Sequence, residues 1–519
     1  MMTSPAEAAG QPSVAVIGAG PAGLAAAVHA AEKGAGTILI DSGARLGGQY
    51  WRHERTGLDG TDNLYHDAAT FHDLRRRLEA LVAAGQLTVL LEHHVWSLQA
   101  DESGCSIAVV DRRDPGQSAE VCVSAAVVVL AVGAYDRQVP FPGWDLPGVL
   151  TVGGAQALLK GSGVAVGPRV LVAGTGPFLL PVATALAARG ADVLGVHEAN
   201  RSLRWLRHLP AAAQPAKLRE AGGYALELAR RRIPLRTSSV VVAAHGTDRL
   251  EAVTVARLDR AGKVRERTRR RVAVDVLAIG YGFTTQSELP LQAGCALATT
   301  ADGTLAVITD STQQTSNPRV YAAGESTGVG GAQLAVVEGV VAGVSAARAA
   351  GRFADRSAAP DHPDSPAGSD PSVGTGKTVE AAVRTRNRLR RFATAMHAVY
   401  PVPGFWLDAL EHDTVICRCE EVTVAEIDAA IGSGARDART VKLLSRSGMG
   451  WCQGRECGYA TSCLIAARTG QPLDLASGAN RPVAAPIQLG LLAQSAQAAQ
   501  ATQAVTAQPQ TSDTAPTTT

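Results

Sequence analysis

The sequence of 519 residues has few aromatic side chains and few cysteines, and it has almost no excess of one charge. Aromatic residues make up 4%, which argues against a stacking platform for single-stranded nucleic acid. With 49 basic and 47 acidic residues, the net charge of +2 excludes electrostatics as the main basis of binding to nucleic acid or to a membrane surface. Eight cysteines are too few for a disulfide scaffold in a chain of this length.

The sequence also lacks the features of an exported or membrane-spanning chain. No Lys or Arg precedes Lys33, so no basic region stands before the first apolar run. Two uncharged stretches, 14–31 and 170–188, approach the length of a membrane span, but each contains a Gly-x-Gly turn. A strand, a turn and a helix explain each stretch better than one apolar helix. We therefore expect no transmembrane segment and a cytoplasmic location.

The composition changes along the chain and predicts its domain organisation. Short Val/Ile/Leu runs alternate with Ala-rich stretches and Gly-rich turns up to residue 350, which is typical of α/β units on a parallel sheet. We predict an α/β fold with two Rossmann-like dinucleotide-binding domains, the second inserted in the first. The expected segments are the first domain (13–165 and 283–350), the second domain (166–282), a linker (351–376), a helical connector (377–411), a small, mostly helical domain (412–475) and a disordered tail (476–519).

A glycine motif near the N-terminus predicts a dinucleotide site. Gly18, Gly20 and Gly23 form a G-x-G-x-x-G pattern between a Val/Ile run and an Ala-rich stretch. In such a motif the first glycine permits the tight turn, the second lets a pyrophosphate approach the backbone, and the third lets the helix pack on the strand. Asp41 ends the next apolar run, where its carboxylate can accept hydrogen bonds from a ribose.

A second segment of the chain repeats this pattern with one change. Gly174 and Gly176 follow another apolar run, and Glu198 stands 24 positions after Gly174, against 23 in the first unit. Leu179 takes the place of the third glycine, which normally lets the helix pack closely. The residues therefore leave NAD, ATP and a unit without a nucleotide open as alternatives. Glu198 argues against NADP because its charge would repel a 2′-phosphate.

Four cysteines near the C-terminus are the most specific feature of the chain. Cys417 and Cys419 form a C-x-C pair, and Cys452 and Cys457 follow after 32 intervening residues. Four convergent thiolates bind either zinc or an iron–sulfur cluster. A C-x-C pair is less suited to a zinc knuckle, which normally has C-x2–4-C spacing, so we favour a [2Fe–2S] cluster and keep zinc as the alternative. Cys463 is interpreted as a packed thiol.

Local signals predict helices around these cysteines. Thr423 and Glu426 have the spacing of a capping box that opens a helix. A second helix is expected after the last cysteine of the set and to end at Gly470. Upstream, the Arg-rich stretch 384–391 is interpreted as a solvated helix face, with a subunit contact as the alternative.

Three further glycine-bearing segments resemble those of flavoproteins with two dinucleotide-binding domains, the family of thioredoxin reductase and ferredoxin reductases. Gly48 follows Asp41 closely, and two other apolar runs end at Gly133 and at Gly324-Glu325. No cysteine pair stands in residues 47–51, so a disulfide reductase is not expected. The resemblance implies that FAD is bound by Gly18, Gly20, Gly23, Asp41, Gly48, Gly133, Gly324 and Glu325.

Residues 13–475 as a whole resemble one family. The segment from Cys417 and the run Cys452-Gln-Gly-Arg-Glu-Cys457 look like the [2Fe–2S] module related to bacterioferritin-associated ferredoxin. Behind two dinucleotide-binding units, this module is similar to the family that contains hydrogen cyanide synthase B subunits, opine oxidase A subunits and D-hydroxyproline dehydrogenase α subunits. The motifs are specific to the family but not to one substrate.

The family resemblance implies a function in electron transfer. It implies an FAD- and [2Fe–2S]-containing subunit of a heteromeric dehydrogenase or oxidase acting on amino or imino acids, of opine, D-hydroxyproline, glycine or sarcosine type. A partner flavoprotein similar to glycine or sarcosine oxidase would remove the hydride from the amine, and a small [2Fe–2S] subunit often completes such a complex. The complex could lie in the cytoplasm or at the periphery of the inner membrane. The alternative is a stand-alone NAD(P)H-dependent FAD oxidoreductase that passes electrons to a ferredoxin-like acceptor. No acid–base or nucleophilic set is identified in the sequence.

Overall fold

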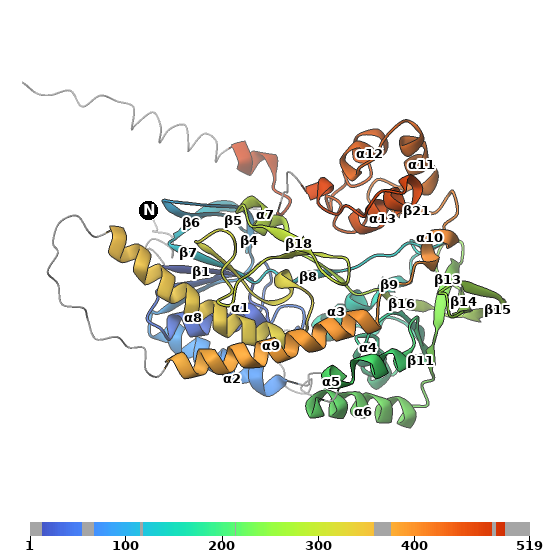
Figure 1. The fold of residues 1–519 in the computed structure, drawn as a ribbon, viewed down its shortest axis with the longest axis horizontal. Coiled ribbons are helices and arrows are strands. Elements are labelled where there is room, and N and C mark those ends of the chain that lie inside the picture. The colour runs from blue at the N-terminus through green and yellow to red at the C-terminus, as the bar shows by residue number, and fades with distance from the viewer. Residues whose placement is uncertain are drawn as a thin grey trace, which may run out of the picture.

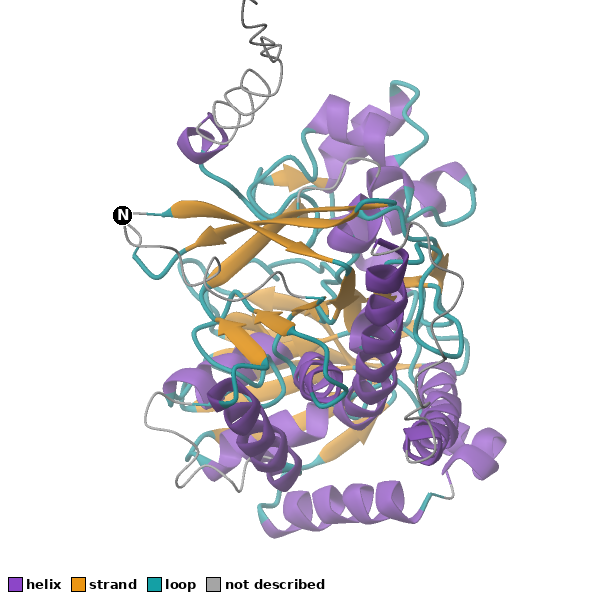
Figure 2. Ribbon diagram, turned by 90° about the vertical axis from the view of Figure 1, so that its left-hand side faces the viewer, coloured by secondary structure: helices purple, strands orange, loops and turns teal. Residues whose placement is uncertain are grey.

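The computed structural model describes residues 13–53, 67–114, 118–212, 214–357, 375–479 and 484–493. Two five-stranded sheets form the centres of two α/β domains, and helices flank both of them (Figures 1 and 2). A small, mostly helical domain follows a long connecting helix. The predicted fold class is confirmed.

The sheet of the first domain has the strand order β20-β7-β1-β2-β3, with all neighbours parallel. Its strands are continuous apolar runs, as expected for a parallel sheet buried on both faces. They are β1 (Val14–Ile17), β2 (Thr37–Ile40), β3 (Leu87–Leu90), β7 (Val127–Leu130) and β20 (Val320–Ala322). Because β20 returns to this sheet after the second domain, the second domain is inserted in the first.

Helices and a smaller sheet cover the two faces of this sheet. The helices are α1 (Pro21–Ala31), α2 (Ala68–Ala83) and α8 (Ala332–Ser357), and the antiparallel sheet consists of β4 (His93–Asp101), β5 (Gly104–Asp111) and β6 (Ala119–Ala125). Short elements complete the domain: α7 (Glu288–Gln292), β18 (Leu297–Thr299), β19 (Leu305–Val307) and the 3-10 helix η3 (Gly324–Thr327). Strands β8 (Ala134–Asp136) and β17 (Phe283–Thr285) pair where the chain leaves the domain and returns to it.

The sheet of the second domain has the strand order β12-β11-β10-β16-β9. Its strands are β9 (Val149–Thr151), β10 (Arg169–Gly174), β11 (Asp192–Glu198), β12 (Leu235–Thr237) and β16 (Val276–Gly280). Its helices are α3 (Val152–Ser162), α4 (Leu179–Ala188), η2 (Ser202–His208), α5 (Leu209–Ala212) and α6 (Pro215–Arg230), and its antiparallel sheet is β13 (Ser239–His245), β14 (Ala252–Leu258) and β15 (Val264–Ala273). The chain joins this sheet at β9, before the predicted boundary at residue 166, because a three-residue strand leaves no periodic signal in the sequence.

The C-terminal part begins with the connecting helix α9 (Thr375–Val399) and the short helix α10 (Phe405–Ala409). The small domain contains β21 (Val415–Cys417), β22 (Val422–Thr423), α11 (Val424–Gly432), α12 (Ala438–Ser445), α13 (Gly458–Thr469) and η5 (Ser477–Ala479). The capping box of Thr423 and Glu426 opens α11, and the left-handed Gly470 ends α13, so both local predictions are confirmed.

The predicted linker and tail are only partly open to inspection. Helix α8 occupies the first seven residues of the predicted linker and runs to Ser357, while α9 begins at Thr375. Residues 358–374 lie outside the described residues, as do 480–483 and 494–519 of the predicted tail.

Helix α8 is, among the described residues, the one helix long and apolar enough to cross a membrane by length and composition. Its apolar stretch Ala332–Ala354 is 67% buried inside the protein. A Cβ on Gly339 would lie 2.1 Å from the carbonyl oxygen of Ala22, and one on Gly343 would lie 2.3 Å from that of Ala26. These close approaches to α1 identify α8 as a core helix of the first domain.

Helix α9 is anchored to the first domain by arginines that the sequence suggested were solvated. Arg386 is 3% exposed and donates to the carbonyl oxygen of Ser311 (2.7 Å) and to Oε1 of Gln313 (3.0 Å). Arg390 donates to the same Gln313 oxygen and pairs with Glu338 at 2.8 Å. The interpretation as a solvated face is therefore wrong for these two residues, whose partners are distant in sequence.

We predict that Arg390→Ala destabilises the protein. The Glu338 carboxylate is 1% exposed, also accepts from the backbone N–H of Gly324 (2.9 Å), and would lose its only positively charged ion-pair partner among the described residues. Breaking a buried pair by removing one partner costs about 3 kcal/mol. Denaturant unfolding should show a loss of this size, whereas Arg391→Ala, an exposed change on the same helix, should change stability little. Equal losses in the two variants would contradict this assignment.

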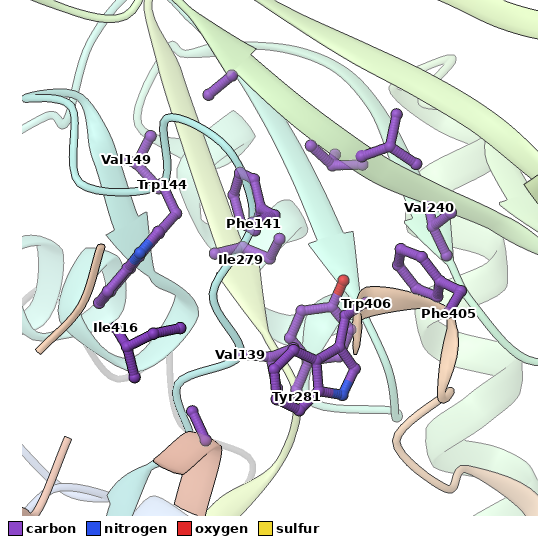
Figure 3. Close-up of a cluster of buried hydrophobic side chains, with 14 of the residues drawn as sticks. Val139, Phe141, Trp144, Val149, Val240, Ile279, Tyr281, Phe405, Trp406 and Ile416 are labelled. Atoms are coloured by element: carbon purple, nitrogen blue, oxygen red, sulfur yellow. The ribbon is translucent and has the colours of Figure 1, made fainter. Parts of the chain in front are cut away.

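The small domain and the second domain share one hydrophobic core. Phe405 and Trp406 of α10 pack beside Tyr281 and Val240 of the second domain (Figure 3). Trp144 donates its indole N–H to the carbonyl oxygen of Val415 at 2.6 Å. Burial of several aromatic side chains at this junction fixes the small domain against the rest of the chain.

Candidate functional site

One large cavity of about 1740 Å³ connects the predicted nucleotide motif, the second domain and the cysteine module. This volume exceeds the usual range of a single ligand pocket, roughly 300–1000 Å³. Seven of the eight residues predicted to bind FAD line it: Gly18, Gly20, Asp41, Gly48, Gly133, Gly324 and Glu325. The structure thus brings together residues from four separate parts of the sequence.

The glycines of the first unit are required by close backbone approaches. Gly18 has a φ of +102°, and a Cβ there would lie 2.3 Å from the carbonyl oxygen of Ala131. A Cβ on Gly23, the eighth predicted residue, would lie 1.6 Å from the carbonyl oxygen of Gly18, so this glycine lets α1 pack on the turn. Gly20 has a negative φ and open space at its Cβ position, facing the cavity. This is the arrangement that a pyrophosphate needs at a helix N-terminus.

Asp41 lies at the end of β2 and faces the cavity. Its Oδ2 accepts from the backbone N–H of Ala19 at 2.5 Å, and its Oδ1 accepts from that of Gly43 at 2.6 Å. Burial raises the pKa of this carboxyl, although both hydrogen bonds oppose the shift. Each carboxylate oxygen keeps further lone pairs for ribose hydroxyls.

A second acidic pair lines the cavity near the return of the first domain. Burial raises the pKa of Glu325 to about 7, and the nearby charge of Asp136 adds to the shift. Asp136 accepts from Thr151 at 2.6 Å, while its Oδ1 is buried without a hydrogen-bond partner in the structure. The sequence analysis missed Asp136; its place three residues after Gly133 was the available signal.

The second unit is built differently around its acidic residue. A Cβ on Gly174 would lie 1.8 Å from the carbonyl oxygen of Gly280, so the turn itself is close-packed. Gly176 lines the cavity, but Gly174 and Glu198 do not. Helix α4 begins only at Leu179, whose side chain is buried in place of a third glycine.

Glu198 is enclosed by the protein. It is 5% exposed and accepts from the backbone N–H groups of Gly176 and Asn200, both at 2.8 Å, and from the Thr175 hydroxyl at 3.3 Å. Burial raises its pKa to about 7 against the effect of these hydrogen bonds. The carboxylate therefore has its hydrogen bonds within the protein and does not face the cavity.

The four predicted cysteines meet in two pairs. The thiols of Cys417 and Cys457 hydrogen-bond to each other, as do those of Cys419 and Cys452. Donation from Cys457 lowers the pKa of Cys417 to about 6, although burial opposes this. Among the described residues, no three Cys, His, Asp or Glu side chains converge as ligands of one metal ion. Two pairs of thiols suit a cluster with two irons, each bound by two cysteines.

Two glycines and a serine shape the space around the thiols. A Cβ on Gly450 would lie 2.2 Å from the Cβ of Cys419, so this position admits no side chain without movement. Gly454 has a φ of +85° within the loop between Cys452 and Cys457. The hydroxyl of Ser447 lies 3.9 Å from the sulfur of Cys457, as a hydrogen-bond donor would.

The cysteine module borders the same cavity as the nucleotide motif. Cys452 lines it together with Arg455 of the same loop. Arg455 donates to the hydroxyl of Tyr135 at 3.0 Å and pairs with Glu288 at 2.8 Å, and both partners belong to the first domain. This loop of the module is thus held at the edge of the cavity by side chains that the sequence analysis did not single out.

The fold and the site together define a flavin oxidoreductase that carries a cluster-binding domain. Residues 12–355 match the family model described as pyridine nucleotide-disulphide oxidoreductase, and residues 415–467 match that of the BFD-like [2Fe-2S] binding domain. The chain belongs to the pyridine nucleotide-disulphide oxidoreductase family, and its small domain is of the BFD-like type. Its cofactors are FAD and a [2Fe–2S] cluster.

Full-length relatives share this combination of domains. The HcnB protein of hydrogen cyanide synthase from Pseudomonas aeruginosa is 32% identical, over 86% of this chain and 92% of that protein. The larger-lettered relative from Rhizobium meliloti, the A component of opine oxidase, is 31% identical, over 92% of this chain and 97% of that protein. The crystal structure of L-proline dehydrogenase from P. horikoshii covers 93% of this chain and 79% of its own with a TM-score of 0.60 and 21% identity, which is a likeness of fold.

Proposed function

We propose that this chain is the FAD- and [2Fe–2S]-containing electron-transfer subunit of a heteromeric amino- or imino-acid dehydrogenase. The observation that carries the proposal is the shared cavity, which the FAD-motif residues line at one end and Cys452 at the other. The names of the relatives, subunits of an opine oxidase and of hydrogen cyanide synthase, support an amine-type donor. The substrate class is thus opine, D-hydroxyproline, glycine or sarcosine.

The residues present fit FAD. We assign the pyrophosphate to the backbone at Gly18 and Gly20 and the adenosine ribose to Asp41. Glu325, at the end of β20, is assigned to the ribityl chain. Gly48, Gly133 and Gly324 let the backbone come close to the cofactor, and each has a positive φ.

The residues also fit the cluster, which we assign to Cys417, Cys419, Cys452 and Cys457. When both cofactors are bound, the flavin supplies two-electron chemistry and the cluster one-electron chemistry. The chain's own contribution is to hold the two sites in one rigid frame. Arg455 serves this role because it ties the loop of Cys452 to Tyr135 and Glu288 of the flavin domain.

The subunit needs partners in this proposal. A flavoprotein subunit similar to glycine or sarcosine oxidase would take the hydride from the amine, and a small [2Fe–2S] subunit would complete the complex. We place the complex in the cytoplasm or, through its partners, at the inner face of the membrane. No nucleic acid enters the proposal, because the charges nearly cancel.

The alternative, a stand-alone NAD(P)H-dependent reductase, has less support. It requires the second unit to bind a nicotinamide dinucleotide, and Glu198, the acid expected at its ribose, does not face the cavity.

The test is co-expression of the chain with the products of its neighbouring genes. Secondary amino acids should bleach the flavin of the complex anaerobically, and NADH should not bleach the flavin of the chain alone. Oxidation of these amines by the chain alone, at a rate that partners do not change, would refute the proposal. Rapid bleaching by NADH would establish the alternative.

A further inference from the structure

The two dinucleotide-binding units differ at two positions beside the acidic residue. Ala19 stands between the first two glycines of the first unit, and Thr175 stands at the matching place in the second. Two residues after the acid, the first unit has Gly43 and the second has Asn200. The backbone N–H at this second position donates to the acid in both units, at 2.6 and 2.8 Å. The repeats therefore share their backbone geometry and differ in side chains.

These two extra side chains bind a segment from far along the chain. The segment is residues 400–402, here called the connector turn, which follows the end of α9 at Val399. The Asn200 amide donates to the carbonyl oxygen of Pro401 at 3.0 Å and to the Thr175 hydroxyl at 2.6 Å. The Thr175 hydroxyl lies 3.4 Å from the carbonyl oxygen of Tyr400. Carbonyl oxygens of the turn thus meet the unit where ribose hydroxyls would otherwise approach.

Aromatic contacts hold the same segment from the other side. Trp205 of η2 donates its indole N–H to the Tyr400 hydroxyl at 3.1 Å. Its ring stacks on Phe392 of α9, with ring centres 5.5 Å apart and planes 22° apart. The connector turn and the last turns of α9 are therefore fixed by both polar and apolar contacts, and α9 leads directly into the cluster-binding domain (Figure 1).

The accessibility of the two acids agrees with this difference. Asp41 and Gly43 line the cavity, whereas Glu198 and Asn200 do not and are 5% and 6% exposed. A ribose needs both hydroxyls within hydrogen-bonding distance of the acid in the Rossmann arrangement. With the turn in place, an adenine dinucleotide cannot bring its ribose to Glu198.

We propose that the second dinucleotide-binding unit is an intramolecular docking surface whose ligand is the connector turn, held by Thr175 and Asn200 at the place of a ribose. Glu198 then orders the loops that carry these two side chains and is not a nucleotide ligand. The unit fixes α9, and with it the position of the cluster-binding domain relative to the flavin. This inference concerns the second unit alone and does not depend on the identity of the amine substrate.

The first arm of the test measures nucleotide binding with NAD⁺ and ADP-ribose as probes. Calorimetry on the full-length, FAD-loaded protein compares wild type with Glu198→Gln. The proposal predicts either no binding or binding whose Kd the substitution changes by less than twofold. A tenfold or larger weakening in Glu198→Gln would show that the acid holds a ribose and would overturn the proposal.

The second arm gives the second unit the small side chains of the first. In Thr175→Ala/Asn200→Gly, hydrogen exchange in peptides covering residues 396–404 should accelerate at least tenfold. Thr184→Ala is the matched control, because the Thr184 hydroxyl bonds only within its own helix, and it should leave the exchange unchanged. Unchanged exchange in the double variant would overturn the proposal. If that variant does not fold, Asn200→Ala alone is measured in the same way. The flavin absorbance of each sample reports separately on the proposed function.

Discussion

Cys457→Ala abolishes the [2Fe–2S] cluster while the flavin stays bound. Cys457 is buried and lies at the start of α13, within hydrogen-bonding distance of the Cys417 thiol. A cluster with one of four ligands removed loses the thiolate that holds one iron, and no other described cysteine takes its place. Iron and acid-labile sulfide in protein purified without oxygen should fall at least tenfold, with the flavin absorbance retained.

The matched control for this loss is Cys463→Ala. Cys463 lies on the same helix, and burial raises the pKa of its thiol to about 11, which is typical of a packed cysteine. The control should keep its iron. Loss of iron in Cys463→Ala but not in Cys457→Ala would show that the ligand set is assigned wrongly.

Gly20→Val should remove FAD without unfolding the protein. A Cβ at Gly20 meets nothing closer than the Cα of Gly48 at 4.0 Å, and the φ of −74° suits any residue. The new side chain would instead occupy the space that faces the cavity, where the pyrophosphate must approach the backbone. The Kd for FAD should rise roughly a hundredfold, or about 3 kcal/mol. Equilibrium dialysis of the refolded apoprotein with FAD measures this change.

Gly404→Val serves as the control for this prediction. Gly404 also has a negative φ of −73° and open space at its Cβ, but it precedes α10, away from the cavity lining. It should bind FAD as tightly as the wild type. If Gly20→Val also kept its affinity, the pyrophosphate would not lie at this turn, and the assignment of the FAD motif would be wrong.

The motifs that predicted this structure are local, and the features that were missed are not. Gly18, Gly20 and Gly23 act within one turn and one helix, so their spacing alone predicts the arrangement found. The capping box at Thr423 is local in the same sense. Cys417 and Cys457 are distant in sequence, but the demand of a cluster for four thiolates linked them before the fold was known.

The missed features depend on tertiary contacts that leave no periodic signal. Arg390 looks like any surface arginine of an Arg-rich helix until Glu338, 52 residues earlier, is placed opposite it. The contact of Asn200 with Pro401 joins residues 201 positions apart. The sequence indicated only that something differed in the second unit, through Leu179. The structure adds a physical reason in the connector turn.

The central claim is that one chain holds a flavin and a [2Fe–2S] cluster close enough to exchange electrons. Anaerobic reductive titration of the full-length protein, followed by visible absorbance and electron paramagnetic resonance, tests it most directly. The account predicts both chromophores in one polypeptide, with the cluster signal growing in as the flavin is reduced. Protein that is yellow but contains no iron, or a cluster that stays oxidised while the flavin is fully reduced, would contradict it.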